Sequence, residues 1–489
     1  MGEISKFYDI QLLILSALCL LALVLDRFYS MSRRKHASED ALAERAESGY
    51  GITGTGEALA TLTKQYLIVY SIVMGADWLQ GPYIYSLYHE QYAYTESTVA
   101  LLFVVGFVSA ALAAPLVGSW ADQHGRKRMC LIFCAVYTTA CICTQTSFLP
   151  ALFLGRVVAG FATSILFSAF EAWLISAASA QGLHSSDLST LMGRATLVNG
   201  IVATGAGVAS NQLVAFTHSF ASPFILSGGL LVVAWLVIRA TWTENYGNSP
   251  VSSGGEKPSS SAGMTTDRFQ IARLGTALRI VRDDTRLLVL GTVQTCFEGS
   301  MYLFVFLWVP ALQQHSTLTQ LPLGFIFSSF MLSMMLGSLL YTFLATRSVD
   351  SSILTHAKLS SCVCAVSGFS LAASASIPDE RVRFWAFCLF ECCVGMYFPV
   401  QGMLRSALIA DSQRATLGAL FRVPLNLLVV GSLLGGVGAV GGEGGRGGVM
   451  TACSLMLCGA SILVGVVLVG RADKYVAQGN PVAVGVIRE

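Results

Sequence analysis

Charge is scarce in this chain. Asp, Glu, Lys and Arg make up 12% of its 489 residues, whereas hydrophobic residues make up 54%. This share of charge is too low for the surface of a soluble protein. The apolar residues come in blocks of about 20 to 28, which suits helices that cross roughly 30 Å of hydrocarbon at about 1.5 Å per residue. The composition therefore predicts an all-α polytopic membrane protein.

Several functional signals are also missing. The net charge is only +2, so the overall charge does not indicate binding to nucleic acid or to an acidic macromolecular partner. Outside the apolar blocks there is no pairing of a nucleophile with a base, no phosphate loop and no metal-ligand spacing, which argues against an enzyme, a cofactor and a metal site. The pattern Gly436-Val-Gly438-Ala-Val-Gly441 matches a nucleotide-binding fingerprint, but no strand precedes it, so we discount it.

The thirteen cysteines do not predict disulfides. Most of them lie inside apolar blocks, and no pair brackets a loop outside these blocks. Examples are Cys141, Cys143, Cys362, Cys364, Cys392 and Cys393. We interpret them as small packing residues.

The first apolar block, residues 8–29, predicts a retained transmembrane helix. The preceding segment MGEISKFYD has no basic excess, no small-residue cleavage site is evident, and the basic run Arg33-Arg34-Lys35 follows the block. These features argue against a secretory signal and predict that the N-terminus lies outside, although a cleaved first helix would change only this end of the topology.

Twelve further spans form two sets of six. The first set is 64–90, 97–121, 127–147, 149–178, 190–214 and 220–242, and the second is 285–312, 321–346, 353–376, 380–410, 414–440 and 446–471. Between them, residues 243–284 are rich in Ser, Gly and charge and predict a flexible cytoplasmic linker. We expect five regions: an N-terminal helix and loop (1–63), an N-terminal half (64–242), the linker (243–284), a C-terminal half (285–471) and a cytoplasmic tail (472–489).

The distribution of basic residues supports this topology. Of the 30 Lys and Arg residues, 22 fall on the side predicted to be cytoplasmic and four lie in or at the edge of helices. The remaining four, on the outer side, are Lys6, Arg381, Arg383 and Arg446. Such an excess of Lys and Arg on one side of the membrane is the bias expected of cytoplasmic loops.

The two sets of spans show weak internal similarity. Asp77 in DWLQGPYIY corresponds to Glu298 in EGSMYLFVF, and Arg156-x-x-x-Gly160 corresponds to Glu391-x-x-x-Gly395. GRATLVNG aligns with FRVPLNLL, which matches Arg194 with Arg422 and, within one residue, Asn199 with Asn426. Such repeats are typical of transporters made by duplication of a six-helix unit, with the substrate held near mid-membrane between the two halves.

The strongest local motif is GSWADQHGRKR between spans 97–121 and 127–147. It resembles the G-x-x-x-D-x-x-G-R-[KR] loop of the major facilitator superfamily, and Arg156-x-x-x-Gly160 resembles the second signature of that superfamily. We expect Gly118 to allow close helix approach, Asp122 to face a neighbouring helix N-terminus, and the cluster Gly125, Arg126, Lys127 and Arg128 to hold the turn at the cytoplasmic surface, where the loop controls gating. The alternative is an ordinary basic turn.

Five ionisable residues fall at membrane depth: Asp77, Arg156, Glu171, Glu298 and Glu391. A charge at the bilayer centre costs about 2.5 to 3.5 kcal/mol, so we expect them to line a central cavity. The alternative is that Arg156 only neutralises a carboxylate in a structural pair, with Glu391 or Glu171 as its partner. Arg194, Arg405 and Arg422 lie near cytoplasmic helix ends, where snorkelling explains at least one of them. Tyr83, Tyr85 and Tyr88 are either interfacial aromatic residues or substrate contacts.

Several longer stretches resemble one family within the superfamily. These are ADWLQGPYIYSLY (76–88), LFSAFEAW (166–173), LLGTVQTCFEGSMYLFVFLWVP from about 289, PLGFIFSSFM (322–331), YFPVQGMLR (397–405) and FRVPLN (421–426). Together they are similar to the eukaryotic molybdate-anion transporters over about residues 64–471. The resemblance implies a plasma-membrane carrier that takes up the tetrahedral dianion molybdate.

An oxyanion site inside a membrane needs fixed positive charge and convergent donors, preferably guanidinium forks. The candidate substrate contacts are Arg156, Arg194 and Arg422, with the neutral donors Asn199, Asn426, Gln80 and Gln294. The acids Asp77, Glu171, Glu298 and Glu391 fit this site only if they pair with arginines or take up protons, and the second option would couple transport to protons.

The sequence leaves other functions open. The excess of buried acid over buried base favours a carrier of another solute, such as a sugar or an organic cation. A receptor or scaffold that moves nothing is also compatible with the fold.

Overall fold

The computed structural model describes residues 2–47, 53–183, 185–246, 278–314, 316, 318, 320–347, 353–409, 411–438 and 442–470. Across these ranges the regular secondary structure is helical, and no strand occurs in them. The described chain divides into two compact units. Unit 1 comprises Met1–Ser249 and Leu318–Met335, and unit 2 comprises Pro250–Thr317 and Leu336–Glu489. The predicted linker and tail fall mainly on 247–277 and 471–489, outside the described residues.

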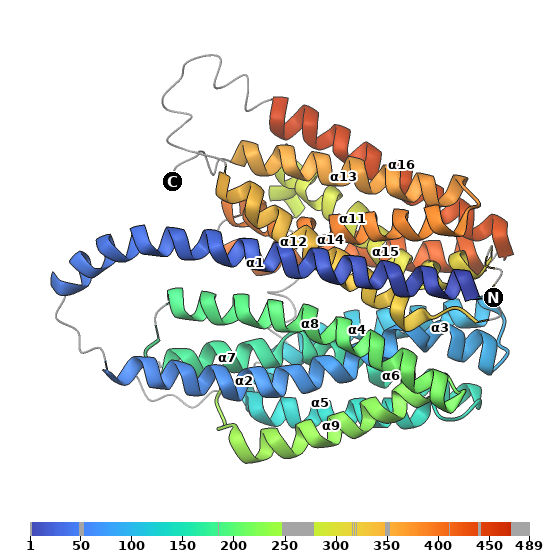
Figure 1. The fold of residues 1–489 in the computed structure, drawn as a ribbon, viewed down its shortest axis with the longest axis horizontal. Helices are drawn as coiled ribbons and strands as arrows, with labels where there is room; N and C mark the ends of the chain where they lie inside the picture. The colour runs from blue at the N-terminus through green and yellow to red at the C-terminus, as the bar shows by residue number, and fades with distance from the viewer. Residues whose placement is uncertain are drawn as a thin grey trace. The chain divides into compact units, whose positions relative to one another are not determined.

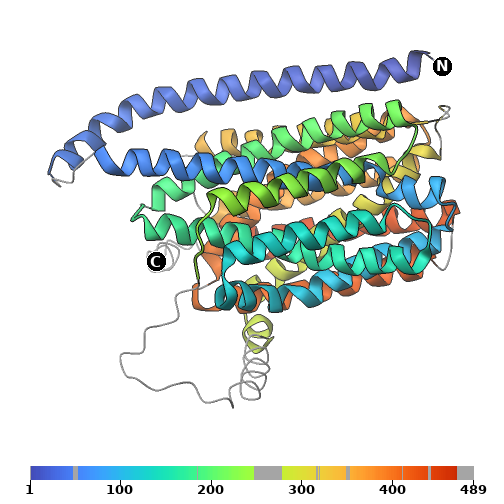
Figure 2. The ribbon, with the colours of Figure 1, turned by 90° about the horizontal axis from the view of Figure 1, so that it is seen from below.

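Unit 1 is a bundle of long helices that run roughly alongside one another (Figures 1 and 2). Its helices are α1 (Gly2–Glu47), α2 (Thr53–Gln80), α3 (Ile84–Ser86), α4 (Glu96–His124), α5 (Arg126–Cys143), α6 (Leu149–Leu166), α7 (Ala169–Ala180), α8 (Ser185–Thr217) and α9 (Ser222–Thr241). A 3₁₀ turn (Gly81–Tyr83) and a π turn (Leu87–Gln91) flank α3, where Pro82 cannot supply a backbone donor. The predicted span 64–90 is therefore regular only as far as Gln80.

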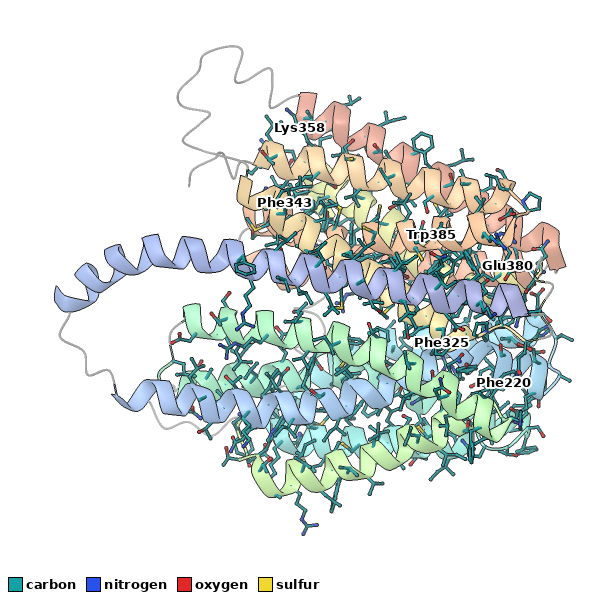
Figure 3. The ribbon with its side chains drawn as sticks, in the orientation of Figure 1. Phe220, Phe325, Phe343, Lys358, Glu380 and Trp385 are labelled. Carbon is teal, nitrogen blue, oxygen red and sulfur yellow. The ribbon has the colours of Figure 1, made fainter. Side chains whose placement is uncertain are left out.

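Unit 2 has the same kind of architecture. Its helices are α11 (Thr285–Gln313), α12 (Leu323–Arg347), α13 (Ile353–Ser376), α14 (Glu380–Leu408), α15 (Asp411–Gly431) and α16 (Gly442–Val464), with π turns at Ser432–Gly438 and Gly465–Val469. The first part of α12 belongs to unit 1 and the rest to unit 2. Lys358 near the start of α13 and Glu380 at the start of α14 lie at opposite ends of the unit, as expected of antiparallel neighbours (Figure 3).

Four of the helix-neighbour relations of unit 1 recur in unit 2. The pairs α2 with α8, α2 with α9, α5 with α6, and α5 with α9 have as counterparts α11 with α15, α11 with α16, α13 with α14, and α13 with α16. In both units, small residues allow two helices to approach each other closely. A Cβ on Gly160 of α6 would come within 2.4 Å of the Gly106 carbonyl oxygen of α4, and Ser338 of α12 donates to the Gly395 carbonyl oxygen of α14 at 3.0 Å. The internal similarity thus extends from sequence to packing.

Within the described ranges, ten helices are long and apolar enough to cross a membrane. They include the N-terminal helix, over Lys6–Phe28. The predicted spans 127–147, 190–214 and 414–440 also form helices, namely α5, α8 and α15, but these are not among the ten. The all-α polytopic fold is confirmed, and the number of twelve core crossings stays a prediction on this criterion.

Two predicted segments differ in detail. The span 149–178 is broken at Phe167 and Ser168, where Ser168 has φ −127° and α6 gives way to α7. The described ends of the predicted linker are ordered, because Glu244 and Asn245 bond to α5 and α7 and residues 278–283 are helical.

Candidate substrate and gating sites

The predicted gating loop is a single-residue turn between α4 and α5. Gly125 has φ +102°, a left-handed conformation that residues with a Cβ rarely adopt. A Cβ at this position would also come within 2.5 Å of the carboxyl carbon of Glu244. Both the backbone conformation and the space therefore require glycine here.

Glu244 caps the N-terminus of α5 from a distant part of the chain. Its Oε1 accepts a hydrogen bond from the Lys127 backbone N–H at 2.8 Å, and its Oε2 accepts one from Arg128 N–H at 3.1 Å. A carboxylate at this end also complements the helix dipole. Sequence reasoning missed Glu244, because it was counted with the linker; its place directly after a transmembrane helix was the available signal.

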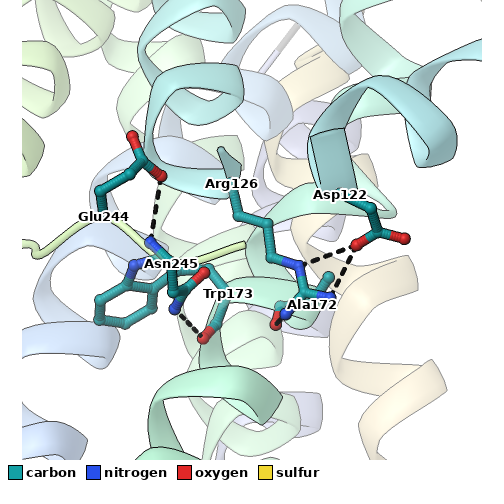
Figure 4. A network of polar contacts seen from close by, with 6 residues as sticks. All are labelled: Asp122, Arg126, Ala172, Trp173, Glu244 and Asn245. Atoms are coloured by element: carbon teal, nitrogen blue, oxygen red, sulfur yellow. Dashed lines mark hydrogen bonds and ion pairs between the residues drawn. The ribbon is translucent and has the colours of Figure 1, made fainter. Parts of the chain in front are cut away.

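Arg126 ties the loop to α7 and to the segment after α9 (Figure 4). Its guanidinium donates to Asp122 Oδ1 at 2.7 and 3.2 Å and to the Ala172 carbonyl oxygen at 3.1 Å. Its backbone N–H donates to the Asn245 carbonyl oxygen at 3.0 Å, and the Asn245 side chain donates to the Trp173 carbonyl oxygen at 3.1 Å. The ring of Trp173 stacks on that of Trp242, with 3.7 Å between the ring centroids.

Two expectations for the loop need correction within unit 1. A Cβ on Gly118 would meet no atom within 4 Å, so Gly118 provides no close helix contact there. The carboxylate at the N-terminus of α5 is Glu244, whereas Asp122 pairs with Arg126 one turn away. The reason is geometric: Asp122 still lies on α4, and its side chain reaches Arg126 across the glycine turn.

Arg156 projects from α6 against α4. Its Nε donates to the Leu102 carbonyl oxygen at 3.4 Å, and its Cζ lies 5.3 Å from the centroid of the Phe103 ring. A Cβ on Gly106 would come within 2.9 Å of Nη2, so this glycine makes room for the guanidinium. The buried Tyr88 hydroxyl lies within electrostatic reach of Arg156 without making a standard hydrogen bond. No carboxylate of the described residues forms an ion pair with Arg156.

The two acids of unit 1 that the sequence placed at membrane depth lie in different surroundings. Asp77 on α2 is half-buried, and its Oδ1 accepts a hydrogen bond of 2.6 Å from the Tyr137 hydroxyl of α5. Glu171, in the first turn of α7, is exposed in the unit and lies near Tyr66 and Tyr70. The structure therefore does not join Glu171 to Arg156.

The neutral donors of unit 1 mainly connect helices. Gln80 donates to Ser227 Oγ of α9 at 2.8 Å, and Asn199 Oδ1 accepts from the indole N–H of Trp78 at 2.8 Å. Arg194 on α8 is exposed. None of these three side chains contacts Arg156 through a hydrogen bond in the described structure.

In unit 2 the acid Glu298 is paired. Arg405 Nη2 of α14 lies 2.9 Å from Glu298 Oε1, which also accepts from the Tyr397 hydroxyl at 3.2 Å. Gln294, one turn earlier on α11, donates to Oε2 at 3.3 Å. Sequence reasoning placed Arg405 at a helix end and missed this pair; YFPVQGMLR, which contains both Tyr397 and Arg405, was the available signal.

The remaining candidates of unit 2 are spread out. Glu391 on α14 is 6% exposed and has no hydrogen-bond or ion-pair partner in the described structure. Arg422 on α15 is exposed within the unit and lies within electrostatic reach of Tyr302, while Asn426 is half-buried. The expectation that Asp77, Arg156, Glu298 and Glu391 line one central cavity involves both units and stays a prediction.

Comparisons with known proteins point to transporters. A family model described as sugar transporters with 12 TM matches residues 37–393. A molybdate-anion transporter of Takifugu rubripes is 33% identical over 83% of this chain and 88% of its own length, and one of Danio rerio is 31% identical over 87% and 91%. A further one, of Xenopus tropicalis, is 34% identical over 73% of this chain and 75% of its own length.

Solved structures show the same fold at low identity. The nucleoside transporter NupG superposes with a TM-score of 0.60 at 14% identity, covering 83% of this chain and 97% of its own. A POT family transporter in complex with 5-aminolevulinic acid gives a TM-score of 0.67 at 9% identity, covering 83% and 95%.

Proposed function

This chain belongs to the major facilitator family that includes the vertebrate molybdate-anion transporters, and on that premise we propose that it carries molybdate across the plasma membrane. The two units would alternate access to a site near mid-membrane. The N-terminus lies outside and the C-terminus in the cytoplasm in this proposal, as the bias of basic residues favours.

The observation that carries the anion assignment is the uncompensated charge of Arg156. A guanidinium held inside a transmembrane helix is costly unless an anion offsets it. In the described residues Arg156 has a carbonyl oxygen and an aromatic face as partners but no carboxylate. A tetrahedral dianion could accept two parallel hydrogen bonds from the guanidinium and also offset its charge, whereas a cation would be repelled and a neutral sugar would leave the charge uncompensated.

Arg422 and Asn426 are the proposed contacts from unit 2, because the repeat matches them with Arg194 and Asn199 of unit 1. Gln80 and Asn199 are engaged in helix contacts and become available only if those contacts break. The carboxyls Asp77, Glu298 and Glu391 offer places for protons, which would make uptake electrically less costly for a dianion.

Uptake of labelled molybdate into a host that lacks its own system tests the proposal. The wild-type protein should accumulate molybdate, with sulfate and tungstate as competitors that define selectivity. Arg156→Ala should abolish uptake, and Arg156→Lys should weaken it, because lysine keeps the charge but loses the fork.

Arg239→Ala is the matched control. Arg239 also lies against an aromatic ring, 5.1 Å from the Trp235 centroid, but at the end of α9. Uptake should remain near the wild-type rate in this variant. Normal molybdate uptake by Arg156→Ala would contradict the assignment of Arg156, and no uptake by the wild-type protein would contradict the proposed function.

A sugar carrier is the second candidate, because the matching family model is described as sugar transporters. The buried amide oxygens of Gln294 and Gln401, which have no hydrogen-bond partner in the described structure, would suit hydroxyl groups. Uptake of labelled hexoses by the same cells, without uptake of molybdate, would favour this alternative.

A further inference from the structure

The ion pair between Glu298 and Arg405 uses only part of the guanidinium. The Glu298 side chain is 14% exposed and that of Arg405 is 34% exposed. Arg405 Nη2 contacts Glu298 Oε1, while Nε, on the same edge of the guanidinium, is buried without a hydrogen-bond acceptor. An arginine edge binds a carboxylate or another oxyanion best through two parallel hydrogen bonds. Glu298 therefore uses one of the two donors on this edge of Arg405, and the other, Nε, remains for an oxyanion.

The neighbouring amide can serve Glu298 in either protonation state. Gln294 is 3% exposed and offers its Nε2 to the Glu298 carboxylate at 3.3 Å, which suits the ionised form. Its Oε1 is buried and has no partner. If Glu298 becomes protonated, rotation of this amide would present Oε1 as the acceptor for the new O–H.

Other groups around Glu298 also bear on its proton. From α14, Tyr397 donates to Oε1 alongside Arg405. Tyr302 on α11 lies within electrostatic reach of both Glu298 and Arg422 of α15. Arg405 thus pairs with Glu298 directly, and a second arginine, Arg422, lies near Tyr302.

We propose that Arg405 is a second oxyanion contact, which Glu298 occupies in the empty carrier and releases when it takes up a proton. The inference rests on the proposed function and specifies its coupling. The dianion would bind together with one proton: Arg405 exchanges the carboxylate for the oxyanion, and the proton resides on Glu298, with Gln294 as its acceptor. On release, the proton leaves Glu298 and the ion pair forms again.

Three variants test the exchange: Glu298→Gln, Arg405→Gln and the double variant. Each is measured for surface level, net molybdate uptake between about pH 5.5 and 8, and exchange of internal for external labelled molybdate. Glu298→Gln should keep exchange but lose the pH dependence of net uptake. Arg405→Gln should lose uptake and exchange by about tenfold to a hundredfold.

The double variant separates binding from charge neutralisation. Without Glu298 there is no buried carboxylate left unpaired, so its surface level should equal that of the wild-type protein, yet uptake should stay as low as in Arg405→Gln. Arg286→Gln is the control, because Arg286 forms an exposed ion pair with Asp284 at 4.0 Å in the same unit.

Restored uptake in the double variant would show that Arg405 only neutralises Glu298, and would overturn the inference while the proposed function stands. An unchanged pH dependence in Glu298→Gln would overturn it as well. If the wild-type protein itself moves no molybdate, the proposed function fails and the inference fails with it.

Discussion

The two units differ in how they pair a charge inside the membrane. Among the described residues of unit 1 the base Arg156 pairs with no carboxylate, and the acid Asp77 accepts a hydrogen bond from the hydroxyl of Tyr137. In unit 2 the acid Glu298 forms an ion pair with Arg405. This contrast exists although the helix neighbours of one unit recur in the other.

The comparison shows that packing positions are alike in the two units whereas the charges differ. The same shift in residue number that aligns Arg156 with Glu391 and Gly160 with Gly395 also aligns Phe170 with Arg405. Phe170 is buried and packs edge-on against Phe133, so unit 1 has an aromatic contact where unit 2 has a cation. The halves of the carrier are therefore related in architecture but differ in chemistry.

The largest expected effect follows directly from this contrast. Arg405→Gln leaves the mostly buried carboxylate of Glu298 without its cation. It should lower the free energy of unfolding by about 3 kcal/mol. This is the low end of the range for breaking a buried ion pair, because Arg405 is partly exposed. Arg156→Gln leaves no carboxylate behind and should cost about 1 kcal/mol or less. Thermal unfolding of the two purified variants in the same detergent measures the difference. Equal losses would mean that Arg156 has an acidic partner after all.

The packing similarity can be tested with glycines in both units. A Cβ would come within 2.4 Å of a backbone oxygen at Gly160, and at Gly337 it would overlap the Cys392 carbonyl group. Gly160→Ala and Gly337→Ala should each destabilise the protein by about 1 to 3 kcal/mol through overpacking.

Gly205→Ala and Gly459→Ala are the controls, one in each unit, because a Cβ at either position would meet no atom within 4 Å. They should be neutral or stabilising by up to about 1 kcal/mol, since alanine favours helices. Thermal unfolding and surface level provide the readout. A harmless Gly337→Ala beside a harmful Gly160→Ala would show that the packing similarity does not carry equal weight in both units.

The loop predicted to control gating distinguishes the units further, because the corresponding stretch of unit 2, GSLLYTFLATR (337–347), keeps little of the motif. Asp122→Asn removes the charge that holds Arg126 and should shift the balance between access states by about 1 to 2 kcal/mol. Uptake turnover should fall while surface level stays near normal. Glu244→Gln should have a smaller effect on turnover and should instead lower stability by about 1 kcal/mol, because it weakens the cap of α5. Wild-type turnover in Asp122→Asn would argue against a gating role.

The smallest effect is expected between the units. Deletion of residues 251–263, which lie outside the described residues, should leave uptake nearly unchanged, since the Ser- and Gly-rich composition predicts a link that is longer than it needs to be. A deletion extended to Glu244 and Asn245 should impair the protein, because these residues bond to the gating loop and to α7. Abolished uptake at normal surface level in the shorter deletion would reveal an ordered element in the linker.

The sequence by itself determined the helices, the superfamily motif and the repeat. These depend on hydropathy along the chain, on the spacing of glycines and charges in one loop, and on the order of matching residues, all of which are local or periodic properties. It also identified Asp77, Arg156, Glu298 and Glu391 as ionisable residues inside helices.

Only the tertiary structure decided which of these groups have partners. Glu298 meets Arg405 across 107 residues of sequence, and Glu244 caps α5 across 117. Such contacts depend on how helices rotate and pack against one another, and a single residue's shift along a helix turns its side chain by about 100°. Hydropathy does not encode that rotation, so the sequence could place a charge in the membrane without showing what neutralises it.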